Sequence, residues 1–410
     1  MICPRRNEAS AHFIFGLWLR GLGLATINHA YLADYDQTGW FTLRILTYVS
    51  GLILLFTPTS RPHRFAPNHL NLWRFVCWCL CLSKLYTLFF LKDVLTQSLL
   101  LSAFYLISAF TIKKSHLYFS ALRSISMLTA STYLMAIFHK LNSDFLFSAQ
   151  SCAIHGFEVS LSLLPSWTLI SHLKTSFMSY LVEWPLFPAS IVITFEWMLC
   201  LLCLYRSKLI WVIGFIFHLP LTLTIAPSFG SVMAVGWGAG TILPHLKKRR
   251  GQKIQITSIY PYILAIYVSH GLLSPYMGIE VQHSAAMLSN LRVDPACANS
   301  LIMPPLGGDP YVYIEEARFG QRSLPKRRLI VKRGLWNLTA ISTMQANWCI
   351  PEHRPLQLSI THRGQSFLID DLCRKDALVP VYNAASIFAL RGWQRYQKNL
   401  QRQCHQTCVH

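Results

Sequence analysis

The residues best placed to do chemistry follow directly on an apolar stretch. Residues 136–145 read AIFHKLNSDF, so His139 and Lys140 end the stretch and Asn142 and Asp144 come next. A lysine at the end of a membrane span commonly extends its ammonium to the lipid headgroups and serves as an anchor. A lysine that is partly withdrawn from water can instead act as a general base, with its polar neighbours as pocket residues. The spacing alone favours the anchor.

Two further ionisable residues lie deep inside apolar stretches. Glu196 precedes Arg206 by ten residues, and His218 follows Lys208 by ten residues. At a rise of 1.5 Å per residue, both side chains would lie roughly 15 Å from the same membrane surface, on neighbouring helices. A lone carboxylate at that depth costs at least about 2.5–3.5 kcal/mol, so a partner is expected. The pair is either a pocket or proton relay, or a structural hydrogen bond between two helices, and the sequence favours neither.

The composition indicates a membrane protein. Of 410 residues, 53% are hydrophobic and only 13% are charged, with a mean hydropathy of +0.36. Soluble domains carry about 25% charged residues. The net charge of +20 could suggest a nucleic-acid partner, but the cations lie between apolar stretches or in a C-terminal tail that also carries acids. We therefore attribute the charge to membrane topology and to attraction for anionic lipids, and we expect no nucleic-acid partner.

Nine apolar stretches have about the length, near 20 residues, that a helix needs to cross the hydrocarbon core. If all nine cross, the Lys and Arg clusters fall on one side, and Asp34, Asp36 and the long 139–186 loop fall on the other. The positive-inside rule then predicts a cytoplasmic N-terminus and a C-terminal tail that is periplasmic, lumenal or extracellular. The nine stretches lie near 9–30, 40–58, 72–91, 94–112, 117–138, 187–205, 208–226, 229–245 and 257–277.

The composition changes after about residue 280, which divides the chain into a multi-span domain (1–279) and an outward-facing α+β tail domain (280–410). Residues 356–372 alternate apolar and polar residues around a His-Arg-Gly-Gln turn, which predicts a β-hairpin. Residues 327–343 look like further strand. Residues 386–402 carry an apolar stripe and a basic stripe at helical spacing, typical of a helix on anionic lipid. The predicted fold class is thus an α-helical polytopic membrane protein with a small C-terminal α+β extramembrane domain.

Six cysteines fall on the predicted outward side, which is compatible with up to three disulfides in an oxidising compartment. Cys152 could connect the outward loop to the tail domain through Cys297, although the sequence does not fix the connectivity. Glu280 and His283 follow the last span and could border a site, but charged residues at the exit of a span are ordinary. No cluster of ligands predicts a metal site.

Two blocks of the sequence resemble the HTTM family of membrane proteins, which are related to vitamin-K-dependent gamma-carboxylase. AIFHKLNSDFLFSAQSCA (136–153) is similar to the signature stretch of that family. SPYMGIEVQHSAAMLSNLRVDPACANSLIMP (274–304) is similar to the family segment after the last spans, with its SNLR core. The mid-span glutamate and the Phe-His pair at 217–218 fall in the expected order, so the resemblance covers most of the chain.

The resemblance implies a role for Lys140. In the carboxylase branch, the corresponding lysine is the proposed base that deprotonates reduced vitamin K, and the oxygenated product then drives glutamate carboxylation. Carried over to this chain, that role falls on Lys140, with a reduced quinone as cofactor and a lipid-soluble or polypeptide substrate. Glu196 and His218 would be pocket residues. The chain departs from the animal carboxylases in its tail, because their lumenal portion is much larger than residues 280–410.

A second class of function stays open at this point. A non-catalytic membrane transporter, or a scaffold for a redox partner, would need no base. It predicts Lys140 at the headgroups, and Glu196 with His218 either lining a path or sealed in packing. An acyl- or glycosyltransferase is a weaker hypothesis, because no acidic pair or His-Asp element stands at a predicted membrane surface.

Overall fold

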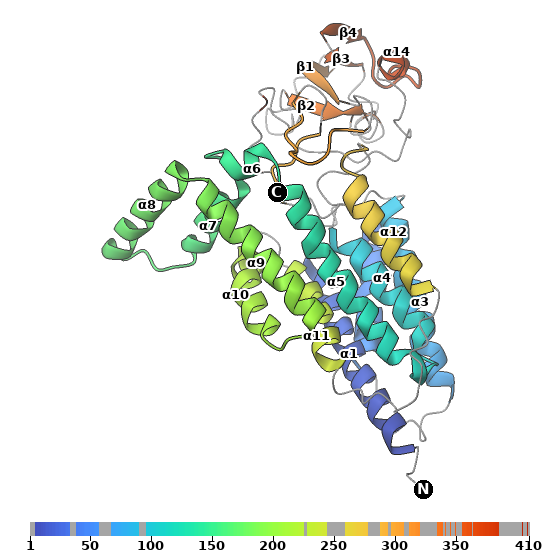
Figure 1. Cartoon of the computed structure of the whole chain (residues 1–410). Helices are drawn as coiled ribbons and strands as arrows, with labels where there is room; N and C mark the ends of the chain where they lie inside the picture. Colours follow the sequence, from blue (N-terminus) through green and yellow to red (C-terminus); the bar gives the residue numbers. More distant parts are fainter. Residues whose placement is uncertain are drawn as a thin grey trace. The chain divides into compact units, whose positions relative to one another are not determined.

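The computed structural model of the chain is mainly helical, with a small antiparallel sheet formed from the C-terminal part of the sequence (Figure 1). It describes residues 5–32, 38–56, 67–89, 96–224, 228–243, 259–277, 288–293, 297–306, 311–319, 334–338, 355–362 and 364–384, with single residues at 341, 345, 349, 404 and 408.

Every one of the nine predicted stretches is a helix. Among the described residues, two helices, α5 and α9, are long and apolar enough to cross a bilayer by length and composition, and six shorter apolar helical stretches accompany them. α3 does not meet this test, and it carries the cationic Arg74 and Lys84. The nine helices are α1 (Arg5–Leu32), α2 (Thr38–Leu55), α3 (Pro67–Phe89), α4 (Thr96–Thr111), α5 (Tyr118–Lys140), α9 (Leu186–Tyr205), α10 (Ile210–Thr224), α11 (Phe229–Ile242) and α12 (Ile259–Leu273).

The chain divides into two compact units. The predicted domain boundary at 279/280 lies outside the described residues. Unit 1 comprises Met1–Met135, Glu158–Ile170 and Val192–Ser269, and unit 2 comprises Ala136–Phe157, Ser171–Ile191 and His270–His410.

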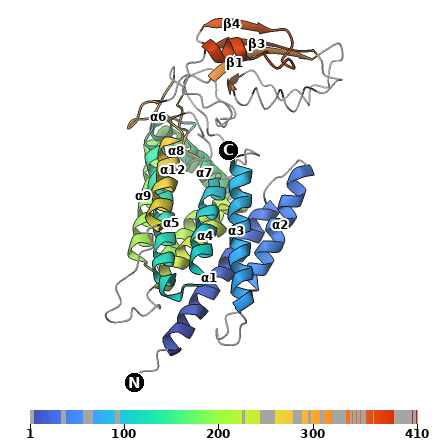
Figure 2. The ribbon, with the colours of Figure 1, turned by 90° about the vertical axis from the view of Figure 1, so that its right-hand side faces the viewer.

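Unit 1 is built from helices that approach one another closely. α1 packs against α2 and α11. α3 packs against both α2 and α4 (Figure 2). A Cβ atom added to Gly23 of α1 would lie 2.5 Å from the backbone nitrogen of Leu55 and 2.7 Å from the carbonyl oxygen of Gly51. Small residues that bring backbones together are the usual packing device of membrane helices.

α11 meets α5 through a second pair of glycines. A Cβ atom at Gly236 would overlap the hydroxyl of Thr129, and one at Gly240 would lie 2.8 Å from Oγ of Ser126. The Ser126 hydroxyl donates a hydrogen bond to the carbonyl of Cys203, at the end of α9. The small size of Gly240 therefore leaves room for Ser126 of α5, which bonds to the backbone of α9 inside an apolar unit.

We expect Gly236→Ala to lower the free energy of unfolding by about 1–3 kcal/mol, because the added methyl group forces Thr129 out of its position. Gly238→Ala is the matched control, since its Cβ would meet no atom closer than 3.9 Å. Thermal unfolding of both variants in detergent micelles checks the prediction. Equal midpoints for the two variants would contradict the close approach.

The prediction that residues 139–186 form a loop is wrong, because most of the segment is helical. It forms α6 (Ser143–Phe147), α7 (Cys152–Ser162) and α8 (Thr168–Glu183). Each helix is shorter than a membrane span, so a search for long apolar runs passes over all three.

The tail forms an antiparallel sheet with strand order β2-β1-β3-β4, from β1 (Tyr311–Phe319), β2 (Gly334–Asn337), β3 (Leu356–His362) and β4 (Gln365–Ile369). The predicted hairpin is confirmed as β3 and β4, and Gly364 in the turn has a φ of +80°, which glycine adopts without strain. β2 lies within the stretch predicted as further strand, whereas β1 was not predicted. The predicted basic helix at 386–402 lies outside the described residues.

The sheet has its own apolar core, which includes α14 (Val379–Ala384). Alternate residues of β3 are buried, as the period of two in the sequence predicts. The buried core consists of Val312, Ile314, Leu338, Ile341, Leu356, Leu358, Ile360, Ile369, Leu372, Leu378 and Val381.

Candidate functional site

The end of α5 and the start of α6 carry four of the predicted site residues, all of them in unit 2. His139, Lys140, Asn142 and Asp144 are buried. Asn142 caps α6, because its Oδ1 accepts a hydrogen bond of 2.9 Å from the backbone N–H of Phe145. Asp144 lies in the first turn of α6, where a carboxylate is favoured by the exposed N–H groups of the helix end. The local sequence thus turns the chain sharply within two residues of Lys140.

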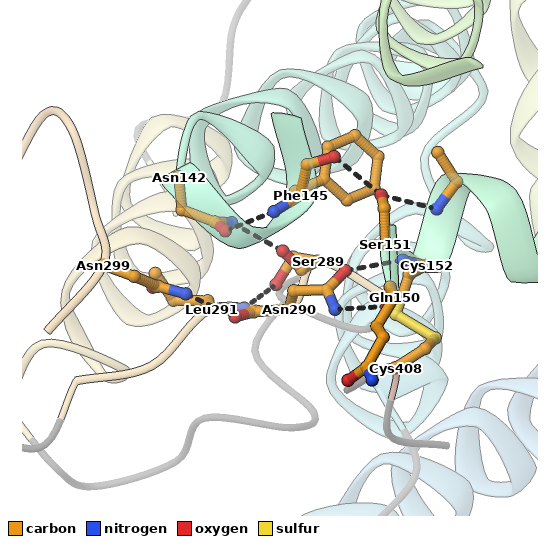
Figure 3. Close-up of a disulfide and its surroundings, with 11 residues drawn as sticks. Asn142, Phe145, Gln150, Ser151, Cys152, Ser289, Asn290, Leu291, Asn299 and Cys408 are labelled. Carbon is orange, nitrogen blue, oxygen red and sulfur yellow. Dashed lines mark hydrogen bonds between the residues drawn. A yellow bond between two sulfur atoms is a disulfide. The ribbon is translucent and has the colours of Figure 1, made fainter. Parts of the chain in front are cut away.

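A segment more than 140 residues further along the chain completes the site (Figure 3). The amide nitrogen of Asn142 donates to the carbonyls of His139 and Ser289. Asn290 accepts a hydrogen bond of 2.6 Å from the backbone N–H of Cys152 and donates to the carbonyl of Gln150. The φ of Asn290 is +54°, a left-handed conformation that asparagine adopts more readily than most residues.

Asn299 joins the two segments most directly. Its amide nitrogen donates to Oδ2 of Asp144 and to the carbonyl of Asn290, both at 2.8 Å. Its side-chain oxygen accepts from the backbone N–H of Arg292 at 2.8 Å, and its own carbonyl accepts from Ser143. Every polar atom of this buried side chain therefore holds a partner in place. We call the three residues Asn142, Asn290 and Asn299 the asparagine cluster.

Lys140 is only 4% exposed. Its Nζ lies 5.8 Å from the ring centroid of Phe145, which places the ammonium over an aromatic face. An anchoring lysine would extend to the surface, and Lys140 does not. Arg292, at 1% exposure, is a second buried cation of unit 2.

His139 is held in place through its ring. Its Nε2 lies 2.7 Å from the carbonyl oxygen of Gly271, and a carbonyl can only accept, so Nε2 carries the proton. The ring also packs against Phe138 and Tyr276. His139 therefore fixes the end of α5 against the end of α12.

Glu196 and His218 belong to unit 1, where both are buried. Nε2 of His218 lies 2.9 Å from the hydroxyl of Tyr133, and Nε1–H of Trp237 donates to the same hydroxyl at 3.1 Å. Because the indole can only donate, the Tyr133 proton is free to point at His218. The sequence predicted the two ionisable residues but missed Tyr133.

We expect Tyr133→Phe to lower the free energy of unfolding by about 1–3 kcal/mol, since the buried indole N–H of Trp237 loses its acceptor. Tyr205→Phe makes the same chemical change at a tyrosine side chain that is 80% exposed, and it serves as the control. Denaturation in detergent, followed by circular dichroism, measures both variants. A loss no larger than that of the control would show that the Tyr133 hydroxyl holds nothing in place.

The predicted link between Cys152 and Cys297 is wrong, because each pairs with a cysteine of the last residues of the chain. The disulfides are Cys152–Cys408, Cys297–Cys404 and Cys349–Cys373, all within unit 2. The count of three agrees with the sequence, whereas the pairing depends on a return of the C-terminus that no local pattern indicates. Cys152 also donates its backbone N–H to Asn290, so one disulfide is attached directly to the asparagine cluster.

Glu280 and His283 lie outside the described residues. Within the part of the chain that the structure describes, no three His, Cys, Asp or Glu side chains are placed to share a metal ion. Asn290 and Asn299 were missed as site residues, although the SNLR core that carries the family resemblance contains Asn290.

The fold thus defines an apolar, mainly helical protein with a small disulfide-linked sheet and a buried lysine beside an asparagine cluster. Comparison of the chain with protein-family models, with curated proteins and with solved structures gives no match in any of the three.

Proposed function

We propose that the chain is a polytopic membrane protein of the HTTM kind, related to vitamin-K-dependent gamma-carboxylase, in which Lys140 is a general base for a lipid-soluble acid. The observation that carries the proposal is the burial of Lys140 beside the asparagine cluster, which joins the two blocks that resemble that family. Helices at all nine predicted positions support a membrane placement. The proposed N-terminus is cytoplasmic and the tail faces outward, where the disulfides fit an oxidising compartment.

Aromatic side chains accompany Lys140, and they are of the type that stacks on a flat apolar ring carrying an acidic hydroxyl. The Phe145 ring lies beside Nζ, and Tyr276 packs with Phe138 and Met303 in an apolar cluster of the same unit. A reduced quinone, such as reduced vitamin K, belongs to this class of ligand and would supply the redox chemistry when bound. In its uncharged form, the amine of Lys140 can take the proton of such a hydroxyl, so that the proton passes from oxygen to Nζ.

The test is consumption of a reduced quinone by the purified full-length protein in lipid nanodiscs, with dissolved oxygen as the electron acceptor. Lys140→Arg is the decisive variant, because arginine keeps the positive charge and the reach but does not deprotonate in proteins. We expect turnover to fall by about 100-fold or more in Lys140→Arg, the range that a lost general base accounts for. Lys375→Ala removes an exposed lysine of the same unit and is expected to retain full turnover.

Two results would contradict the base. Full turnover in Lys140→Arg would show that only the charge matters, as for an anchor. Equal loss in Lys140→Arg and Lys375→Ala would show that the loss of turnover is not specific to Lys140.

A non-catalytic transporter or scaffold for a redox partner is the second candidate. The observation that favours it is the closed hydrogen bonding of the asparagine cluster, whose amides bind protein backbone and Asp144. Such a cluster can serve to hold unit 2 together and nothing more. Stable, well-folded wild-type protein that neither retains nor turns over a quinone would favour this candidate.

A further inference from the structure

α8 carries an exposed apolar stripe. Leu173, Phe177, Tyr180 and Trp184 recur at intervals of four, three and four residues, which places them on one face of a helix. Their exposed fractions are 62, 38, 46 and 58%. Trp184 continues the face beyond the last helical residue, because its N–H donates to the carbonyl of Tyr180. We call these four residues the α8 stripe.

The other side of α8 is polar. Ser171, Thr175 and Ser179 repeat every fourth residue, and all three are exposed. The hydroxyls of Thr175 and Ser179 donate to carbonyls of their own helix, one turn earlier, and so need no outside partner. Within α8 the only buried residue is Leu181. Phe177 packs edge-on against Phe157, and Tyr180 packs edge-on against Phe187. The described residues nevertheless leave much of the apolar stripe and of the polar side exposed.

The position of α8 in the chain indicates what covers the stripe. α8 ends at Glu183 and α9 begins at Leu186, and α9 is one of the two described helices long and apolar enough to cross a bilayer. Three residues of chain span at most about 11 Å. If α9 crosses, the end of α8 is therefore held at the level where the bilayer begins.

We infer that α8 lies in the plane of the membrane, with the α8 stripe inserted at the boundary between lipid headgroups and acyl chains. Tyr180 and Trp184 are the residue types enriched at that boundary, because their rings are apolar at one end and polar at the other. This lipid-binding face rests on the proposed crossing of α9 and is independent of any chemistry at Lys140. Its effect is to hold the start of α9, and the chain that leads to it, at a fixed depth.

Photocrosslinking in nanodiscs tests the inference on the full-length protein. p-Benzoylphenylalanine is placed, in separate variants, at Phe177 or Leu173 of the stripe, at Thr175 of the polar face, and at the exposed Leu201 of α9. The nanodiscs contain phosphatidylcholine and phosphatidylglycerol. Variants that elute like the wild type in size-exclusion chromatography are irradiated, and peptides are searched for the mass of an attached phospholipid.

We expect lipid adducts at residues 173, 177 and 201 and no lipid adduct at residue 175. Adducts at residue 201 alone would overturn the inference and leave the membrane crossing intact. Adducts at none of the positions would overturn both. Equal lipid adducts at residues 175 and 177 would mean that lipid surrounds α8. A crosslink from residue 177 to another protein would mean that a protein, and not lipid, covers the stripe. Either of these results overturns the in-plane placement, and none of them depends on quinone turnover.

Discussion

Asn299→Asp is expected to lower the free energy of unfolding by about 3 kcal/mol or more, as usual for buried polar groups that lose a partner. The substitution keeps the shape of the side chain and the acceptor for the N–H of Arg292. It replaces the nitrogen that donates to Asp144 and Asn290 with an oxygen. Two carboxylate oxygens would then face each other in a buried site, where both cannot stay ionised without penalty.

A reversed pair makes this prediction specific. In the Asn299→Asp background, Asp144→Asn puts a donor back opposite the new carboxylate, so we expect it to recover at least about 1 kcal/mol. Gln150→Glu makes the same chemical change at an exposed position of unit 2 and is the control. Chemical denaturation in detergent micelles measures all variants. If Asn299→Asp matches Gln150→Glu, or if Asp144→Asn adds to the loss, the hydrogen bonds at Asn299 do not hold the two segments together.

Removal of the Cys152–Cys408 disulfide by a Cys408→Ser substitution is expected to lower stability by about 2–4 kcal/mol. The bond closes a loop with a sequence separation of 256, against 24 for Cys349–Cys373. Because the entropy that a cross-link removes from the unfolded chain grows with loop length, we expect a larger loss than for Cys373→Ser.

The control for this comparison is Cys203→Ser, which alters a buried free cysteine without opening a loop. Unfolding of each variant is followed with and without a reducing agent. The reductant should bring wild type and Cys408→Ser closer together. A Cys408→Ser variant as stable as the wild type under oxidising conditions would contradict the contribution of this bond.

The sequence predicts those parts of the fold that depend on local pattern. Long apolar runs locate all nine helices, and the alternation around Gly364 locates the β3–β4 hairpin. α8 shows the limit of a search by length, because its apolar stripe repeats at helical spacing but the helix is shorter than a span. The 139–186 segment was consequently taken for a loop.

The candidate site is only half visible in the sequence. Lys140, Asn142 and Asp144 lie within five consecutive residues, so one short motif indicates them together. Asn299 stands 155 residues from Asp144 along the chain, and a hydrogen bond at that separation leaves no periodic signal. The pairing of the six cysteines was missed for the same reason, since six cysteines allow 15 pairings and spacing does not choose among them.

The most direct test of the central claim is native mass spectrometry of the purified protein, combined with extraction of its lipids, with wild type beside Lys140→Arg and Lys375→Ala. We predict that wild type and Lys375→Ala retain a quinone, supplied in its reduced form, and convert it, whereas Lys140→Arg leaves the reduced form unconverted. Absence of a bound quinone from all three proteins, under conditions in which each is folded, would contradict a role for Lys140 as the base of a quinone site.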